Sequence, residues 1–84
     1  MTADTTKAAI LTLLGRITPD SDLSQLRGDV PLRDELEIDS MDFLNLLIAV
    51  AGELHVEIPE RDYGKVLSLD ALVAYVDARR PRAG

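Results

Sequence analysis

The residues best suited to chemistry are Asp39 and Ser40, which stand directly before a run of mostly apolar residues. A serine at the start of a helix lies beside backbone N–H groups without intrahelical partners, at the positive end of the helix dipole. A phosphodiester built on the Ser40 hydroxyl would be stabilised there by roughly 0.3–1 kcal/mol. The same pair also fits a simple helix N-cap, so taken alone it leaves both interpretations open.

Several other kinds of chemistry are disfavoured by the composition. The chain has no cysteine and one histidine, which leaves no thiolate nucleophile, no disulfide and no metal-ligand pattern. A hydrolytic pair of Ser40 and His55 is excluded within one straight helix, because a rise of about 1.5 Å per residue separates them by about 22 Å. The formal net charge of -6 would repel nucleic acid. We therefore expect no metal site and no nucleic-acid partner.

Acidic residues gather around Ser40, with no basic residue between positions 34 and 42. The cluster comprises Asp34, Glu35, Glu37, Asp39 and Asp42. Such a run is either solvated loop charge or a surface that guides basic partners toward the site. We favour guidance, and we expect Glu35, Glu37 and Asp42 to contact partner proteins.

Hydrophobic periodicity predicts three main helices. The first begins near Asp4 or Thr5 and ends before Pro19, with Ile10, Leu13, Leu14 and Ile17 on one face. The second runs from Ser40 to about Leu54. Its apolar face comprises Phe43, Leu46, Leu47, Val50, Ala51 and Leu54. The last is capped by Ser68, ends at Arg79 to Pro81, and places Leu69, Leu72, Val73 and Val76 on one face.

The connections between these helices differ in length. Residues 18–39 are rich in Asp, Ser, Gly and Pro, yet leucines and Val30 recur as anchors, which favours a structured loop over a flexible linker. Pro59 is suited to the first position of a short helix that runs through about Tyr63 and is interrupted by Gly64. We expect an all-α fold, a small antiparallel four-helix bundle of three main helices plus a short third helix, with a long first loop. The 84 residues fit a single domain with a core of about 4–80 and short flexible termini.

The stretch from Leu32 to Val50 resembles the acyl carrier protein family around its phosphopantetheine attachment site. In that family an Asp-Ser-Leu or Asp-Ser-Met motif opens the second helix, and here Asp39-Ser40-Met41 stands at that place. The segments Glu57-Ile58-Pro59 and Ser68 to Leu72 also look like family features, so the resemblance covers nearly the whole chain. One departure is Glu37, at a position where the family commonly has glycine.

The resemblance implies that Ser40 carries 4′-phosphopantetheine, added from coenzyme A by a phosphopantetheinyl transferase, with Asp39 assisting recognition and metal-bound coenzyme A. The arm would supply the thiol that the chain lacks. It would hold acyl groups as thioesters for fatty-acid, polyketide or related enzymes, such as acyltransferases, ketosynthases or acyl ligases. The chain itself would not be an enzyme.

Two alternatives remain beside an acyl carrier. Peptidyl and aryl carriers are close relatives, but the Gly-Gly pattern that peptidyl carriers usually place before the modified serine is absent from residues 37–40, which favours an acyl cargo. The second alternative is a helical interaction module that carries no arm, in which Ser40 only caps a helix.

The exposed side of the central helix predicts a surface for dedicated partners. Met41, Asn45, Ile48 and Gly52 group together on a helical wheel, and no residue from Phe43 through Gly52 is charged. We expect charge to guide the approach of a partner and Met41 and Ile48 to enter partner pockets, with Asn45 between them. The longest apolar stretch, Leu46 to Ala51, is too short to span a membrane, and the polar N-terminus does not resemble a secretory signal. We expect a cytoplasmic monomer.

Overall fold

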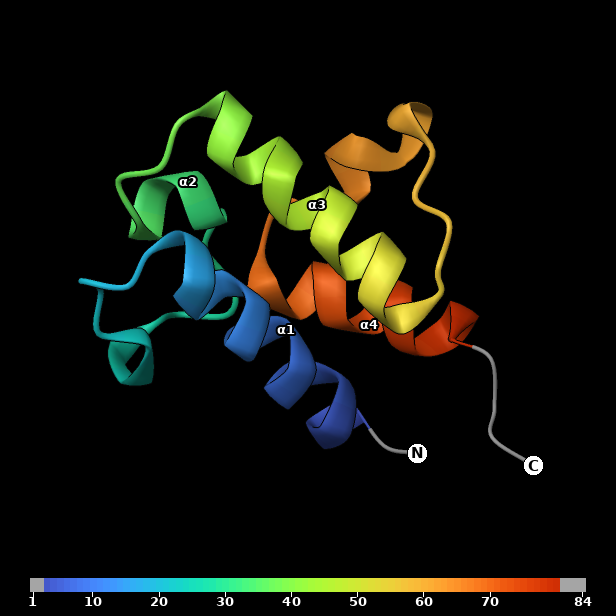
Figure 1. Ribbon diagram of the computed structural model, residues 1–84, viewed down its shortest axis with the longest axis horizontal. Coiled ribbons are helices and arrows are strands. Elements are labelled where there is room, and N and C mark those ends of the chain that lie inside the picture. The colour runs from blue at the N-terminus through green and yellow to red at the C-terminus, as the bar shows by residue number, and fades with distance from the viewer. Residues whose placement is uncertain (1–2, 81–84) are drawn as a thin grey trace.

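A computed structural model describes residues 3–80, and all of its regular elements are helical (Figure 1). The three long helices are α1 (Ala3–Ile17), α3 (Ser40–Leu54) and α4 (Leu69–Arg79). The short elements are the single-turn α2 (Leu32–Glu35) and two 3-10 helices, η1 (Leu23–Gln25) and η2 (Glu60–Lys65). This confirms the all-α fold. The short flexible termini that we expected lie outside the described residues.

The long helices pack around one core. In Figure 1, α1 runs roughly opposite to both α3 and α4, and it contacts each of them. The connection that carries η1 and α2 crosses one end of the bundle, where α1 ends and α3 begins. The antiparallel arrangement therefore holds for α1 against the other two helices.

The predicted apolar faces form the core. Ile10, Leu14, Leu46 and Val50 are completely buried, and the predicted face of α4 is buried throughout. Only Ile17 and Ala51 of the predicted sets are half-buried. The helix boundaries of α3 and α4 agree with the sequence, whereas α1 starts one or two residues earlier than predicted.

The starts of α3 and α4 are fixed by side-chain caps. The Asp39 carboxylate accepts the N–H of Asp42 at 2.9 Å, and the Ser68 hydroxyl accepts the N–H of Ala71 at 3.1 Å. Each cap satisfies one of the backbone donors that a helix start leaves free. The cap at Asp39 places Ser40 as the first residue of α3.

The connection over residues 18–39 is anchored to the start of α4. The N–H of Leu32 donates to the Leu67 carbonyl at 2.8 Å, and the N–H of Asp70 donates to the Gly28 carbonyl at 3.0 Å. A side chain at Gly28 would overlap the Asp70 carboxylate, so this close approach requires glycine or a shift of Asp70. Leu32 is fully buried, which confirms a structured loop.

The short third helix exists but differs from the prediction. It is a 3-10 helix that begins at Glu60, with Pro59 as its cap, and it continues through Gly64 to Lys65. Our expectation that Gly64 interrupts it was wrong. In a 3-10 helix each bond spans three residues, so a short segment can form without the apolar periodicity of an α-helix.

Candidate functional site

The first turn of α3 separates the roles of Asp39 and Ser40. The side-chain carboxylate of Asp39 accepts a hydrogen bond from the N–H of Asp42, and its backbone carbonyl accepts one from the N–H of Phe43 at 3.0 Å. Asp39 is therefore the N-cap, and Ser40 is not needed for capping. The simple interpretation of the pair as a cap is satisfied by Asp39 alone.

Ser40 is exposed, and its hydroxyl makes no hydrogen bond to another described residue. The backbone N–H groups of Ser40 and Met41 also have no acceptor among the described residues. These two donors lie at the positive end of α3, next to the free hydroxyl. The arrangement offers an accessible oxygen on which a phosphate can be built and two N–H groups near that phosphate.

The acidic cluster is unevenly exposed. Asp34, Glu37 and Asp39 are exposed, whereas Glu35 and Asp42 are half-buried. The Glu35 carboxylate lies 4.0 Å from the Arg27 guanidinium, and only 19% of its side chain is accessible. The sequence has no basic residue between positions 34 and 42, but the fold brings Arg27 from outside this segment against the cluster. Glu37 and Asp39 are thus the most available carboxylates beside Ser40.

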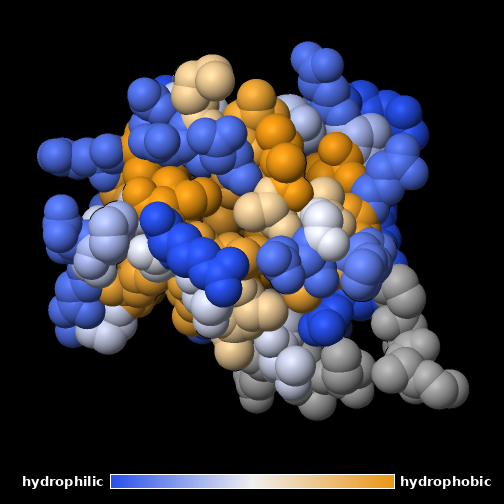
Figure 2. All heavy atoms as spheres, in the orientation of Figure 1, coloured by the Kyte–Doolittle hydropathy of each residue, from blue (hydrophilic) through white to orange (hydrophobic). Residues whose placement is uncertain are grey.

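The expected partner residues of α3 lie on its outer face. Met41 is 63% exposed, Ile48 is 59% exposed, and Asn45 and Gly52 are also exposed. Figure 2 shows apolar atoms at the surface over the middle of α3. We call these four residues the outer strip of α3. Their exposure is as predicted, while their role in partner binding stays a prediction.

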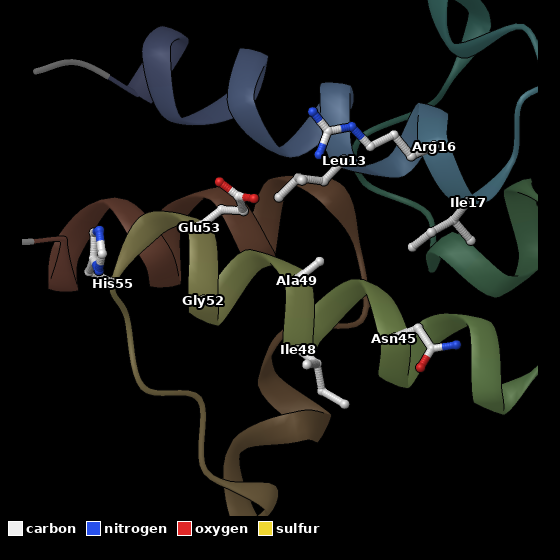
Figure 3. Close-up of a pocket in the computed structure, with 9 residues that line it drawn as sticks. All are labelled: Leu13, Arg16, Ile17, Asn45, Ile48, Ala49, Gly52, Glu53 and His55. Atoms are coloured by element: carbon white, nitrogen blue, oxygen red, sulfur yellow. The ribbon is translucent and has the colours of Figure 1, made fainter.

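A groove of about 470 Å³ runs between α1 and α3 beside this strip. Figure 3 shows Ala49 and Glu53 pointing toward α1 and Leu13 pointing toward α3, while Ile48 points away at the outer edge. The far end of the groove is at His55, an exposed residue with no assigned role in the sequence analysis. The sequence did not indicate this groove, because it depends on how closely α1 and α3 approach.

A smaller hollow of about 330 Å³ lies near the start of α3, lined by residues that include Ile38, Phe43 and Leu67. Leu67 is 44% exposed and was missed by the sequence analysis, since it stands outside the periodic part of α4. Phe43 is 8% exposed and belongs to the core. Ile38 is also buried, so Leu67 is the exposed one of these three residues.

Within residues 3–80, no three His, Cys, Asp or Glu side chains gather in a way that could hold a metal ion. None of the helices described here is long and apolar enough to cross a membrane.

The fold and site define a small helical domain that presents a free serine hydroxyl at the start of its central helix. The family model described as the phosphopantetheine attachment site matches residues 4–76, and the chain belongs to this family of carrier domains. It is 36% identical over 63 residues to the D-alanyl carrier protein 1 of Lactiplantibacillus plantarum, covering 75% of this chain and 76% of that protein. It is 25% identical over 59 residues to the acyl carrier protein of Helicobacter hepaticus, covering 70% and 78%.

Membership in this family means that the protein is a non-catalytic carrier with a covalently attached 4′-phosphopantetheine. The alternative of a helical module without an arm is thereby overturned. The first turn of α3 fits the group, because a phosphate built on the free, exposed Ser40 hydroxyl would lie near two backbone donors without an acceptor among the described residues.

Proposed function

We propose that the Ser40 oxygen is the attachment point of 4′-phosphopantetheine and that the chain carries an acyl group between biosynthetic enzymes. The observation that supports this most directly is the division of roles in the first turn of α3. Asp39 caps the helix, which leaves the Ser40 hydroxyl exposed and without a hydrogen bond to the described residues. The arm, once bound, supplies a thiol that holds the acyl group as a thioester.

Attachment requires the Ser40 hydroxyl to act as a nucleophile in the active site of a phosphopantetheinyl transferase. Its oxygen bonds to the phosphorus of the phosphopantetheine half of coenzyme A, its proton leaves to a base, and adenosine 3′,5′-bisphosphate departs. The exposure of Ser40 allows this approach, and the N–H groups of Ser40 and Met41 favour the negative phosphodiester afterwards. Asp39 holds the helix start in place and presents a carboxylate to the transferase.

Intact-protein mass spectrometry tests the attachment site. After incubation with coenzyme A and a broad-specificity transferase, the wild type should gain the mass of one phosphopantetheine and Ser40→Ala should gain nothing. Ser21→Ala is the matched control, because Ser21 is also exposed but lies outside the site, and it should be modified like the wild type. If Ser40→Ala also gained this mass, the arm would be attached to a residue other than Ser40.

The cargo is proposed to be an acyl group of a fatty-acid, polyketide or related pathway. The family membership and the acyl carrier protein of Helicobacter hepaticus support this proposal, as does the absence of a Gly-Gly pair before Ser40. Peptidyl or aryl cargo remains the alternative. Incubating the armed chain with malonyl-coenzyme A and an acyltransferase of fatty-acid synthesis should add a malonyl group, and absence of the added mass would count against this pathway.

A second candidate is a D-alanyl carrier, supported by the 36% identity to the D-alanyl carrier protein 1 of Lactiplantibacillus plantarum. The enzyme that charges that relative can be tested directly on the armed chain. A mass gain of one D-alanyl group, with no gain in the malonyl reaction, would assign the chain to this class.

The partner surface proposed here has two parts. The carboxylates around Ser40 guide a basic enzyme, and the outer strip of α3 then docks through Met41 and Ile48. Since the strip is uncharged, it fits a dedicated partner set better than a general one. We also propose that the chain acts as a monomer in the cytoplasm.

A further inference from the structure

No contact within the chain explains why position 52 is a glycine. It lies in the α-helical part of α3, where glycine is less favourable than alanine because it loses more conformational freedom. A Cβ atom at Gly52 would meet no atom within 4 Å, so no close packing requires glycine. Gly52 lines the groove between α1 and α3, and its missing side chain keeps that part of the groove open.

The groove is connected to Ser40 by an uncharged path. Met41, Asn45, Ile48 and Gly52 follow one another at spacings of three or four residues along the exposed face of α3. Gly52 lies about 18 Å from Ser40 along the helix axis at 1.5 Å per residue. Asn45 and Ala49, which also line the groove, lie nearer, at about 7.5 Å and 13.5 Å from Ser40 on the same measure. If a phosphopantetheine arm is taken as about as long as five extended residues, roughly 17 Å, it spans these shorter distances. The arm on Ser40 can therefore reach the groove.

We propose that the phosphopantetheine arm rests along the outer strip of α3, with its thiol end in the groove between α1 and α3. This rests on the proposed attachment at Ser40. The arm beyond its phosphate is uncharged, as is α3 from Phe43 to Gly52. The apolar side chains of Leu13, Ile17 and Ala49 offer contact to its methyl and methylene groups, and the exposed amide of Asn45 offers a donor and an acceptor to its amides.

Two hollows near the start of α3 compete with the groove. One, of about 400 Å³, is lined by the carboxylates of Asp22, Glu35 and Glu37, which would lose water on contact with an uncharged arm. The other is the hollow lined by Ile38, Phe43 and Leu67. It is smaller, about 330 against 470 Å³, and Arg33 and Asp34 also line it. These charged groups would lose water on contact with an uncharged arm. The groove is also lined by Arg16 and Glu53. Figure 3 shows Arg16 on α1, across the groove from Asn45 and Ala49, and Glu53 toward the His55 end, so neither belongs to the outer strip that the arm would follow.

A nitroxide attached to the thiol of the arm distinguishes these positions. The ¹⁵N-labelled chain is armed with coenzyme A, its mass is checked, and the nitroxide is added through a maleimide. We expect paramagnetic broadening of the amide signals of Leu13, Ala49 and Gly52, with much less at Leu67. Reduction of the nitroxide with ascorbate gives the reference spectrum.

Two glycine variants complete the test. Gly52→Leu fills the groove, so the broadening at Leu13 and Ala49 should fall to the level seen at Leu67. Gly64→Leu is the matched control, because Gly64 is exposed and also has open space at its Cβ position, and it should leave the broadening unchanged. Broadening centred on Leu67, confined to the first turn of α3, or unaffected by Gly52→Leu would overturn the proposal. A wild type that gains no arm in the mass check would instead contradict the attachment at Ser40, and the resting position with it.

Discussion

Asp39 performs a structural task that is separable from its charge. Its carboxylate accepts the N–H of Asp42, and asparagine is an equally good N-cap, whereas alanine cannot cap. The free energy of unfolding of Asp39→Asn should therefore lie within a few tenths of a kcal/mol of the wild-type value, whereas that of Asp39→Ala should be about 1 kcal/mol lower. Urea denaturation followed by circular dichroism measures both.

The same two variants test the proposed role of the Asp39 charge in arm attachment. Both should lower the kcat/KM of the transferase about tenfold, the size of one lost charge-assisted contact. If Asp39→Asn were modified as fast as the wild type while Asp39→Ala were slower, Asp39 would matter only as a cap.

Asp62 and Tyr75 are a hydrogen-bonded pair of titratable groups whose pKa values shift in opposite directions. The Tyr75 hydroxyl donates to the Asp62 carboxylate at 2.6 Å, and Lys65 lies 3.3 Å from the same carboxylate. The hydrogen bond from Tyr75 lowers the pKa of Asp62, and the hydrogen bond to Asp62 raises the pKa of Tyr75. The pair joins η2 to α4, so its ionisation state is linked to stability.

This pair predicts how stability changes with pH. A lowered pKa at Asp62 gives stabilisation that is present above about pH 4 and lost as the pH falls through the folded pKa. A raised pKa at Tyr75 gives stabilisation that is present below about pH 10 and lost as the pH rises through the folded pKa. Tyr75→Phe should thus be less stable than the wild type between these limits and approach it at both extremes.

Urea denaturation across the pH range measures this difference. Tyr63→Phe is the control, because the Tyr63 hydroxyl makes no hydrogen bond to the described residues. If the free energies of unfolding of the wild type and Tyr75→Phe differed by the same amount at all pH values, packing and not the hydrogen bond would account for the difference.

Single residues were predictable from the sequence where their role is local. The caps at Asp39 and Ser68 each involve a backbone N–H three positions further along the chain. The contacts of Tyr75 and Thr6 were missed because their partners are distant: Thr6 is fully buried, and its hydroxyl donates at 2.8 Å to Asp77, 71 positions away. No local pattern marks such a pair.

At the scale of elements, the long helices and the place of η2 were predictable from the sequence, whereas α2 and η1 were not. α1, α3 and α4 each span several turns, so apolar residues recur often enough to define a face. α2 has four residues and η1 has three, which is too few for a period to be recognised. Their formation depends on tertiary anchoring, such as the hydrogen bond of Leu32 to Leu67. The groove between α1 and α3 likewise depends on packing.

The end of α3 carries a residue in an unfavourable backbone conformation. His55 has φ 56° and ψ 45°, the left-handed region that usually requires glycine. The N–H groups of His55 and Val56 both donate to the Ala51 carbonyl, and Val56 is buried directly after the turn. This geometry is needed to turn the chain from α3 toward η2.

His55→Gly should therefore stabilise the protein by about 0.5–1 kcal/mol, because glycine adopts this conformation without the clash of a Cβ atom. His55→Ala retains the Cβ and should stay close to the wild type. Thermal and urea denaturation of the three proteins measure the effect. A loss of stability in His55→Gly would mean that the imidazole contributes more than the backbone strain costs.

At the scale of the whole molecule, charge is distributed asymmetrically. The exposed carboxylates of Glu37 and Asp39 lie at the start of α3. Around η2 and the end of α4, the carboxylates of Glu57, Glu60 and Asp62 are offset by the cations of Arg61, Lys65 and Arg79. Figure 1 places η2 and the end of α4 on the side away from α2. A basic partner would therefore be drawn to the end that carries Ser40.

This asymmetry predicts that the position of a charge matters more than the net charge. The double variant Glu37→Gln/Asp42→Asn changes the formal net charge from -6 to -4, and so does the control Glu57→Gln/Glu60→Gln, whose carboxylates are exposed near η2. At low ionic strength, where the Debye length is about 30 Å, the first pair should lower the transferase kcat/KM about tenfold and the second pair much less.

At 0.15 M salt, with a Debye length of about 8 Å, the wild type should slow toward the first variant, whose own rate should change little. Because neither pair contributes a side-chain hydrogen bond to the described fold, both variants should keep the circular-dichroism spectrum of the wild type. Equal losses in the two double variants would mean that net charge alone sets the encounter rate, and the cluster around Ser40 would have no guiding role.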